Sequence, residues 1–197
     1  MRHRVPYEIE IKLKVDDPRA FKKKLKESGF VMVERRRFES NLVFDFRNSR
    51  LRRSRSLLRL RKTAGRDILT FKGPPRPSDS YKVRPEIELE VCDAETLQCI
   101  LKSLGLHPIF RYEKYRTIFA ERGRRRTADT PVAALDETPI GTYIELEGPG
   151  GWIDRKAMRL GYRKKDYIKA SYAALYRKQC RRCGIRPEDM VFLRHKS

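Results

Sequence analysis

The chain has 197 residues, 39% hydrophobic and 37% charged, so it can form one domain with a buried core beneath a highly charged surface. Its 47 lysines and arginines outnumber 26 aspartates and glutamates, and the net charge of +21 favours polyanionic partners such as nucleic acid, phosphate-rich small molecules or an acidic membrane surface. No apolar run approaches the roughly 20 residues of a membrane-spanning helix, and the charged N-terminus is unlike a signal peptide, so we expect a cytoplasmic protein.

The first predicted element is a strand over residues 7–15 (YEIEIKLKV), because its apolar residues alternate strictly. The other face of this strand carries Glu8, Glu10 and Lys12 in one row. A solvated sheet face would have this composition, and so would a site that holds metal ions and an anionic substrate. The strand alone does not choose between the two.

A short helix and a second strand follow. In residues 16–30, Asp17 can cap the helix and Gly29 suits its end. The segment Phe38 to Phe46 predicts a strand, and residues 48–56 (NSRLRRSRS) predict a basic loop.

Residues 56–74 predict a hairpin with its turn near Gly65, and residues 74–80 (PPRPSDS) predict a loop. Residues 84–106 then repeat the beginning of the chain. Both stretches contain an alternating acidic strand, followed by a helix that starts at an aspartate and ends at a glycine, here Gly105.

The remaining predicted elements are a strand at 111–120, a basic turn at 121–130, strands at 132–137 and 142–149, and helices around 154–160 and 167–183. The chain therefore consists mostly of strands, with a helix after the first strand of each half. This pattern predicts an α+β fold class, an antiparallel sheet or closed barrel with flanking helices and two pseudo-repeated halves.

At least six predicted strands carry a charged face backed by an apolar one, since residues of equal parity share a face. The sets are Glu8/Glu10/Lys12, Arg59/Arg61, Thr70/Lys72, Arg84/Glu86/Glu88, Lys114/Arg116 and Tyr143/Glu145/Glu147. For any single strand, a face that meets water is the simpler interpretation. Acids predominate on some strands and bases on others, however. This segregation favours a closed sheet whose charged face lines a lumen.

Such a lumen would have a chemical use. Clustered carboxylates bind hard cations such as Mg²⁺ or Mn²⁺, and lysine and arginine bind phosphate oxygens. Together they would hold a metal-bound polyphosphate and stabilise the charge that develops when phosphorus is attacked.

The motif Glu8-x-Glu10-x-Lys12 resembles the signature of the CYTH, or triphosphate tunnel metalloenzyme, superfamily. That superfamily includes class IV adenylyl cyclases, thiamine triphosphatases, inorganic triphosphatases and fungal-type RNA triphosphatases. Later segments follow the family's order: SLLRLRK, TFKGP, RPEIELEV, YEKYRTIF, LDETPIGTYIELEGP and DYIKASYAALY. The resemblance covers roughly residues 5–178 and implies an eight-stranded antiparallel tunnel, with residues 1–197 as a single CYTH domain and residues 184–197 as a basic tail.

The resemblance also implies roles for individual residues by motif position. The implied metal ligands, for Mg²⁺ or Mn²⁺, are Glu8, Glu10, Glu86, Glu88, Asp136, Glu145 and Glu147. The implied triphosphate-binding residues are Lys12, Arg59, Arg61, Lys72, Arg84, Lys114 and Arg116. The implied catalytic residues are Lys12, Lys72, Glu88 and Lys169, the last by a looser match near the tunnel mouth.

Three functions are compatible with this resemblance. The first is metal-dependent hydrolysis of the terminal phosphoanhydride of a small triphosphate: tripolyphosphate, ATP or thiamine triphosphate. The second is adenylyl cyclase activity, which converts ATP to cyclic AMP and pyrophosphate. A non-enzymatic binder of RNA or polyphosphate ranks last, so a nucleic-acid partner is disfavoured; no membrane partner is expected, and a homodimer is left open.

Three arginine-rich runs lie outside the motifs: Arg35 to Arg37, Arg50 to Arg55 and Arg122 to Arg126. Solvated loops are the simpler interpretation of these runs, and a polyanion-binding role is the alternative.

Overall fold

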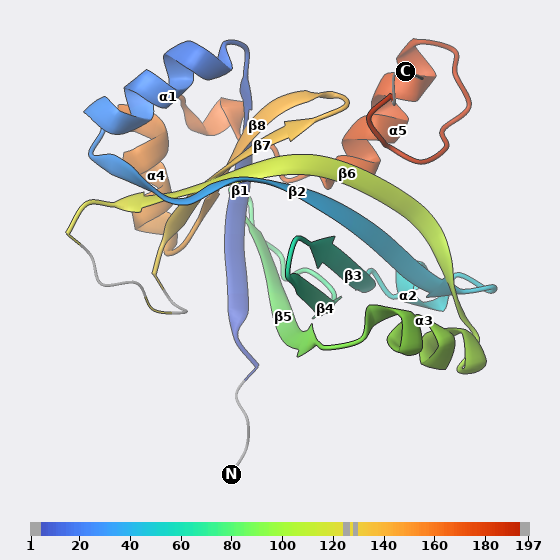
Figure 1. Cartoon of the computed structure of the whole chain (residues 1–197). Helices are drawn as coiled ribbons and strands as arrows, with labels where there is room; N and C mark the ends of the chain where they lie inside the picture. The colour runs from blue at the N-terminus through green and yellow to red at the C-terminus, as the bar shows by residue number, and fades with distance from the viewer. Residues whose placement is uncertain (1–4, 124–126, 128–129, 194–197) are drawn as a thin grey trace.

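The structure is a computed structural model that describes residues 5–123, 127 and 130–193. In these residues, eight strands close into one antiparallel barrel in the order β1-β5-β4-β3-β2-β6-β7-β8 (Figure 1). The expected fold class, an eight-stranded antiparallel barrel with flanking helices, is therefore confirmed. Within the described part of the chain, no helix combines the length and apolar character that crossing a bilayer requires.

The strands are β1 (Tyr7–Val15), β2 (Phe30–Phe46), β3 (Leu57–Thr63), β4 (Arg66–Lys72), β5 (Lys82–Val91), β6 (Leu106–Glu121), β7 (Val132–Thr138) and β8 (Gly141–Glu147). The helices are α1 (Pro18–Glu27), α2 (Arg50–Arg53), α3 (Ala94–Ser103), α4 (Gly150–Arg159) and α5 (Tyr172–Arg182), with a 3₁₀ turn η1 (Lys164–Asp166).

The two longest strands, β2 and β6, extend well beyond the predicted segments. β2 begins at Phe30 rather than Phe38, and β6 begins at Leu106 rather than Arg111. The two strands pair along their length, but the register shifts around Glu34. Such bulges break the two-residue alternation, and this explains why the charged first half of β2 was not recognised as a strand.

Three other boundaries differ from the prediction. The expected basic loop at 48–56 contains the short helix α2, and α4 begins at Gly150. The last helix begins at Tyr172 instead of Tyr167, because Ile168 exchanges backbone hydrogen bonds with Lys12 of β1. Part of the basic turn expected at 121–130, residues 124–126 and 128–129, lies outside the described residues.

The two halves of the barrel begin alike, as expected, with a strand, a capped helix and a long strand. Asp17 accepts hydrogen bonds from the first backbone N–H groups of α1, and Asp93 does the same for α3. Gly29 and Gly105 follow the two helices with φ of +83° and +84°, a conformation that glycine adopts without strain.

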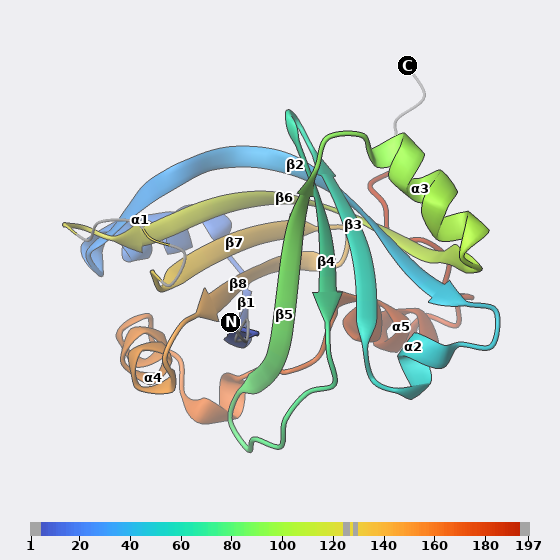
Figure 2. The same cartoon turned by 90° about the horizontal axis from the view of Figure 1, so that it is seen from below.

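Helices cover the apolar outer face of the barrel on two sides (Figure 2). Ile11 and Leu13 of β1 pack with Phe21 of α1 and with Trp152 and Ile153 of α4. A second cluster joins α3 to β2 and β3. Because the apolar residues point outward, the charged residues of the same strands point into the lumen.

The C-terminal strap, residues 185–193, packs against β6 where β7 does not reach. β7 pairs with β6 from Tyr115 onward, whereas Met190 exchanges backbone hydrogen bonds of 2.9 Å with Arg111 and Glu113. The Met190 side chain is fully buried among Tyr112, Tyr143 and Tyr172. The strap therefore completes the wall of the barrel at this end.

We predict that Met190→Ala lowers the free energy of unfolding by about 2–4 kcal/mol, because it leaves a cavity among three tyrosines. Urea denaturation would measure this loss. Ile185→Ala, in the same strap but 61% exposed, should cost less than about 0.5 kcal/mol. Equal, small effects of both variants would mean that the strap is not part of the folded core.

Candidate active site

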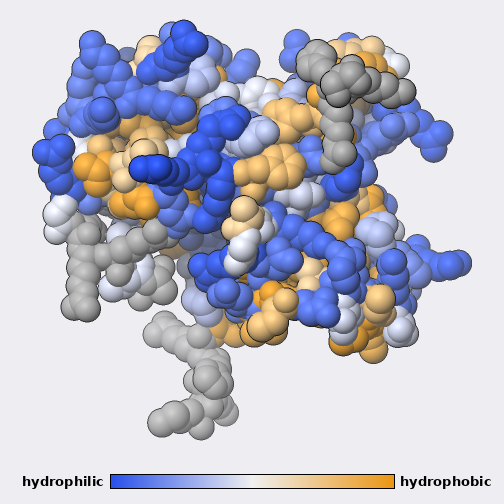
Figure 3. Space-filling view, in the orientation of Figure 1, coloured by the Kyte–Doolittle hydropathy of each residue, from blue (hydrophilic) through white to orange (hydrophobic). Residues whose placement is uncertain are grey.

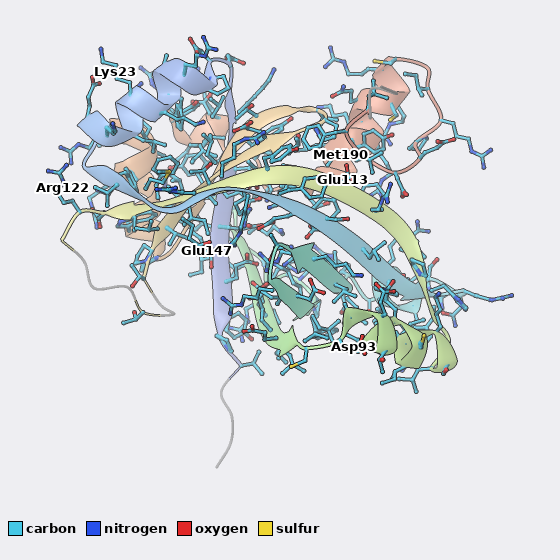
Figure 4. All side chains as sticks on the ribbon, viewed as in Figure 1. Lys23, Asp93, Glu113, Arg122, Glu147 and Met190 are labelled. Carbon is cyan, nitrogen blue, oxygen red and sulfur yellow. The ribbon has the colours of Figure 1, made fainter. Side chains whose placement is uncertain are left out.

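The barrel encloses a cavity of about 950 Å³ that is lined by charged side chains from β1, β3, β4, β5, β6 and β8. Glu8, Glu10, Glu145 and Glu147, which lie at opposite ends of the sequence, all face this cavity. Register explains the convergence, since β1 pairs with β8 so that Glu10 is opposite Glu147 and Lys12 is opposite Glu145. Figure 4 labels Glu147 on β8.

Four carboxylates form an acidic cluster at one side of the cavity: Glu8, Glu10, Glu86 and Glu147. Burial and then the negative charge of Glu8 raise the pKa of Glu147 to about 8. Burial likewise raises the pKa of Glu86 to about 7, although Lys72 opposes the shift. These two carboxylates are therefore harder to ionise than a free glutamate, whereas, against the effect of burial, Lys12 and Lys82 hold the pKa of Glu10 below its usual range.

Lysines hold the acidic cluster in the present arrangement. The Lys72 ammonium lies 2.5 Å from Glu8 and 3.1 Å from Glu86, and Lys82 is paired with Glu10. Lys12 lies between Glu10, at 3.1 Å, and Glu145, at 3.0 Å. Burial opposes the charged form of Lys12, but Glu10 and Glu145 raise its pKa above the usual value.

Asp136 is fully buried and its carboxylate is saturated with donors. It accepts a hydrogen bond of 2.9 Å from Lys114, two of 2.6 Å from Arg116 and one of 2.7 Å from the Tyr172 hydroxyl. Asp136 does not line the cavity, whereas Lys114 and Arg116 do. Asp136 therefore orients Lys114 and Arg116 from the side away from the cavity.

The opposite side of the cavity is basic. Arg59 donates to the Tyr112 hydroxyl at 3.2 Å and to Thr70 at 3.1 Å, and Arg61 donates to Glu88 at 2.7 Å. Burial, and then the like charge of Arg59, lower the pKa of Arg61. Glu88 therefore lies with the arginines.

Two of the expected site residues are engaged by backbone carbonyls. Arg84 lines the cavity, but its guanidinium donates to the carbonyls of Gly73, Lys72 and Arg55. Lys169 is exposed and donates to the carbonyls of Ser78 and Asp79, each at 2.9 Å. The structure thus brings Lys169 to the loop between β4 and β5 and not to the lumen.

Several lumen residues were not singled out from the sequence. Glu39 of β2 is fully buried beside Lys114 and Arg61, and these cations lower its pKa to about 2 against the effect of burial. Lys82 shares the parity of Arg84, so strand alternation could have identified it. Tyr172 comes from a helix, and its ring lies 5.3 Å from the Lys12 ammonium and 5.5 Å from that of Lys114; strand parity carries no signal for such a residue.

The arrangement suits a linear anion with several phosphates. Cations on β1, β3, β4 and β6 face one cavity from different directions, and arginine and lysine both bind phosphate oxygens. The acidic cluster adjoins these cations and offers the oxygen ligands that hard cations prefer.

Comparisons with known proteins agree with this geometry. A family model described as the CYTH domain matches residues 6–166. A protein of Methanocaldococcus jannaschii named a putative adenylate cyclase is 31% identical over 140 residues, which are 71% of this chain and 75% of that protein.

Two solved structures show the same barrel. A putative adenylate cyclase from Vibrio parahaemolyticus has a TM-score of 0.72 and 20% identity, covering 86% of this chain and 97% of that chain. A putative adenylyl cyclase from Hippeastrum, described as having a dominant triphosphatase activity, has a TM-score of 0.59 and 20% identity, covering 87% and 96%.

We predict that Asp136→Asn destabilises the protein by about 3 kcal/mol, because it leaves the buried cations Lys114 and Arg116 without their main anionic partner. Thermal and urea denaturation without ligand would measure the loss. Glu137→Gln is the matched control on the same strand, since its more exposed pairs with Arg36 and Lys22 should contribute about 0–1 kcal/mol. An unchanged stability of Asp136→Asn would contradict the orienting role.

Proposed function

The chain belongs to the CYTH family, and we propose that it is a metal-dependent enzyme that hydrolyses the terminal phosphoanhydride of a small triphosphate. The observation that carries this proposal is the convergence of lysines and arginines from several strands on one cavity, with an acidic cluster at its side. The cations alone would bind a polyphosphate but no metal ion, and the acidic cluster alone would bind a metal ion but no polyphosphate.

The acidic cluster fits a divalent cation by the chemistry of its donors. Family members are generally metal-dependent, and a bound cation would offset the burial and the neighbouring carboxylates that raise the pKa values of Glu86 and Glu147. Among the described residues, no three acidic, histidine or cysteine side chains converge closely enough to hold an ion as they stand. Glu8 and Glu10 are instead bonded to lysines, so binding requires these lysines to turn away. When bound, Mg²⁺ or Mn²⁺ would polarise the phosphoryl group and neutralise charge that develops on it.

We propose that the lysines exchange partners when substrate enters. Lys12, Lys72 and Lys82 would move their hydrogen bonds from carboxylates to phosphate oxygens, and the released carboxylates, with Glu147, would hold the metal. Arg59, Arg61, Lys114 and Arg116 would hold the rest of the triphosphate chain. Cations held in fixed positions stabilise the charge that develops on phosphate, and no reorganisation of solvent is needed.

The other implied residues take supporting roles in this proposal. Asp136 orients Lys114 and Arg116 and does not ligate the metal directly, since four hydrogen bonds saturate it. Glu88 pairs with both Arg59 and Arg61 and so offsets the repulsion between their charges. The catalytic role expected for Lys169 stays a prediction, because that lysine is bonded to the loop between β4 and β5.

Adenylyl cyclase activity is the second candidate, and the similarity to the M. jannaschii protein favours it. In that reaction the ribose 3′-hydroxyl attacks the α-phosphorus of ATP, and pyrophosphate leaves. The same cations would hold the triphosphate in a different register.

One experiment separates the two activities. Purified protein is incubated with tripolyphosphate, ATP or thiamine triphosphate, each with Mg²⁺ or Mn²⁺, and phosphate, pyrophosphate and cyclic AMP are measured separately. Phosphate from ATP or thiamine triphosphate, or equimolar phosphate and pyrophosphate from tripolyphosphate, supports the hydrolase when no cyclic AMP forms. Equimolar cyclic AMP and pyrophosphate from ATP would replace it by the cyclase. No product from any pair would contradict both.

We predict that metal and tripolyphosphate stabilise the protein cooperatively. At a hundredfold excess over its dissociation constant, a single ligand adds about 2.7 kcal/mol. Each ligand breaks the same lysine–carboxylate pairs and so frees the group that the other ligand binds. The Tm shift with both ligands should therefore exceed the sum of the separate shifts. Glu10→Gln should abolish most of this excess, whereas Glu90→Gln, whose carboxylate pairs with Arg66 at the barrel end, should retain it. Additive shifts in the unmodified protein would contradict a shared site.

We predict that Arg61→Gln raises the KM for tripolyphosphate at least tenfold and changes Tm by only a few degrees. Its like-charge neighbour Arg59 already destabilises the charged form of Arg61, so removing that charge offsets the loss of its hydrogen bond. Lys62→Gln is the control on the same strand, because Lys62 points outward to Glu95. A large fall in Tm without substrate would assign Arg61 a structural role.

A further inference from the structure

The segment around α2, residues 47–56, is composed differently from the rest of the basic surface. Its five cationic residues are all arginines, and it contains no lysine and no acid; they are Arg47, Arg50, Arg52, Arg53 and Arg55. In the part of the chain that the structure describes, none of these five side chains forms an ion pair. Leu51, Arg52, Ser56 and Leu57 line the tunnel cavity, so the segment borders its mouth.

The end of α2 contains an arginine where the other helices have a glycine. Ser56 N–H bonds to the Leu51 carbonyl and Arg55 N–H bonds to the Arg52 carbonyl, which is the pattern of a Schellman C-cap with Arg55 in the left-handed position. Arg55 has φ of +57°. The residues at the same position after α1, α3, α4 and α5 are Gly29, Gly105, Gly161 and Gly184.

This conformation is strained for an arginine but not for glycine. Ser49, just before α2, is also left-handed, with φ of +57°. Strained residues persist where the surroundings hold them, and they are concentrated at ligand-binding segments. An arginine at a position where glycine would be unstrained therefore indicates a use for its side chain.

Two buried residues of the barrel hold the α2 segment in place. The Asp45 carboxylate accepts hydrogen bonds from the backbone N–H groups of Leu51 and Arg52. The Arg84 guanidinium donates to the Arg55 carbonyl at 2.7 Å. The arginines are thus displayed from a fixed backbone at the mouth of the cavity. The face of the molecule drawn in Figure 3 is mostly hydrophilic, with smaller apolar patches between the charged residues.

The chemistry of this rim fits a nucleic-acid strand better than a bare phosphate chain. Arginine binds phosphate in fork geometry and stacks on flat rings, which lysine does less well. The same cavity also carries apolar surface from Ile109, which is 53% exposed, and from the half-buried Phe110, whose ring stacks with Tyr112 and Tyr176. Phosphates alone would not require that surface.

We propose that the α2 rim binds single-stranded nucleic acid, with Arg50, Arg53 and Arg55 on successive phosphates and the bases against Ile109 and Phe110. This binding does not depend on hydrolysis in the tunnel, so the two proposals stand or fall separately.

The test measures binding of a labelled RNA of about 12 nucleotides with a 5′-hydroxyl, in EDTA, by fluorescence anisotropy over a range of salt. Arg53→Ala/Arg55→Gly should weaken binding about tenfold and reduce the slope of log K against log salt by about 1.4, from about 0.7 for each lost contact. The matched control is Arg155→Ala/Arg159→Ala on α4, which removes the same charge from the side of the barrel away from α2 (Figure 1). It should change affinity less than twofold.

Stability supplies a second readout. Because glycine relieves the strain at position 55, Arg55→Gly alone should keep Tm or raise it by about 2 °C while weakening binding. Arg50→Ala/Arg53→Ala leaves Arg55 in place and should weaken RNA binding to a similar extent. This variant keeps the test informative if a substitution at position 55 lowers the stability of the protein.

Three outcomes would overturn the proposal. If the rim and α4 variants weakened RNA binding equally, net charge alone would explain the effect. If the rim variant lost as much affinity for inorganic polyphosphate as for RNA at equal phosphate number, the rim would recognise phosphate alone. A fall in Tm for Arg55→Gly would show that arginine is kept there for the fold.

Discussion

A charge inside a closed barrel must have an opposite charge within reach, because the strands leave little water to solvate it. The lumen satisfies this requirement by interleaving carboxylates and cations from neighbouring strands. Lys12 lies between Glu10 and Glu145, and Lys114 and Arg116 share Asp136. The barrel architecture, with helices over an apolar outer face, follows from the need to bury the other side of the same strands.

This neutralisation is incomplete in one place, and that place is informative. In the acidic cluster, burial and then the negative charge of Glu8 raise the pKa of Glu147, so Glu147 binds its proton more tightly than a free glutamate does. A site that is acidic on one side and basic on the other accommodates a cation and a polyanion together. The exchange of lysine partners then links the two binding events, and linkage of this kind is reciprocal.

Strand alternation predicted most of the charged lumen face, because parity decides which face a side chain occupies. It left an open sheet and a closed barrel as alternatives, and the charge pattern and the family resemblance favoured the barrel. Alternation failed in the first half of β2, where bulges near Glu34 interrupt the period. It also missed Glu39, which lies within the predicted strand, because Asn41 and Val43 of equal parity are uncharged. Family position identified Asp136 but not its environment, since three donors from β6 and α5 meet there only in three dimensions. Likewise, nothing in the sequence indicates that Lys169 bonds to the carbonyls of a distant loop.

The C-terminal segment shows how a helix outside the barrel can control charges within it. The Tyr172 hydroxyl donates to Asp136, the carboxylate that binds Lys114. The ring of the same residue faces the ammonium groups of Lys12 and Lys114. Its ring packs in the cluster that contains Met190, and the strap fixes Met190 to the edge of β6 through two backbone hydrogen bonds. Displacing the strap would therefore loosen Tyr172 first and the orientation of the two lysines next, although no residue of the strap reaches the acidic cluster. The lumen is thus completed by residues that follow the last strand, and the eight strands alone do not determine its electrostatics.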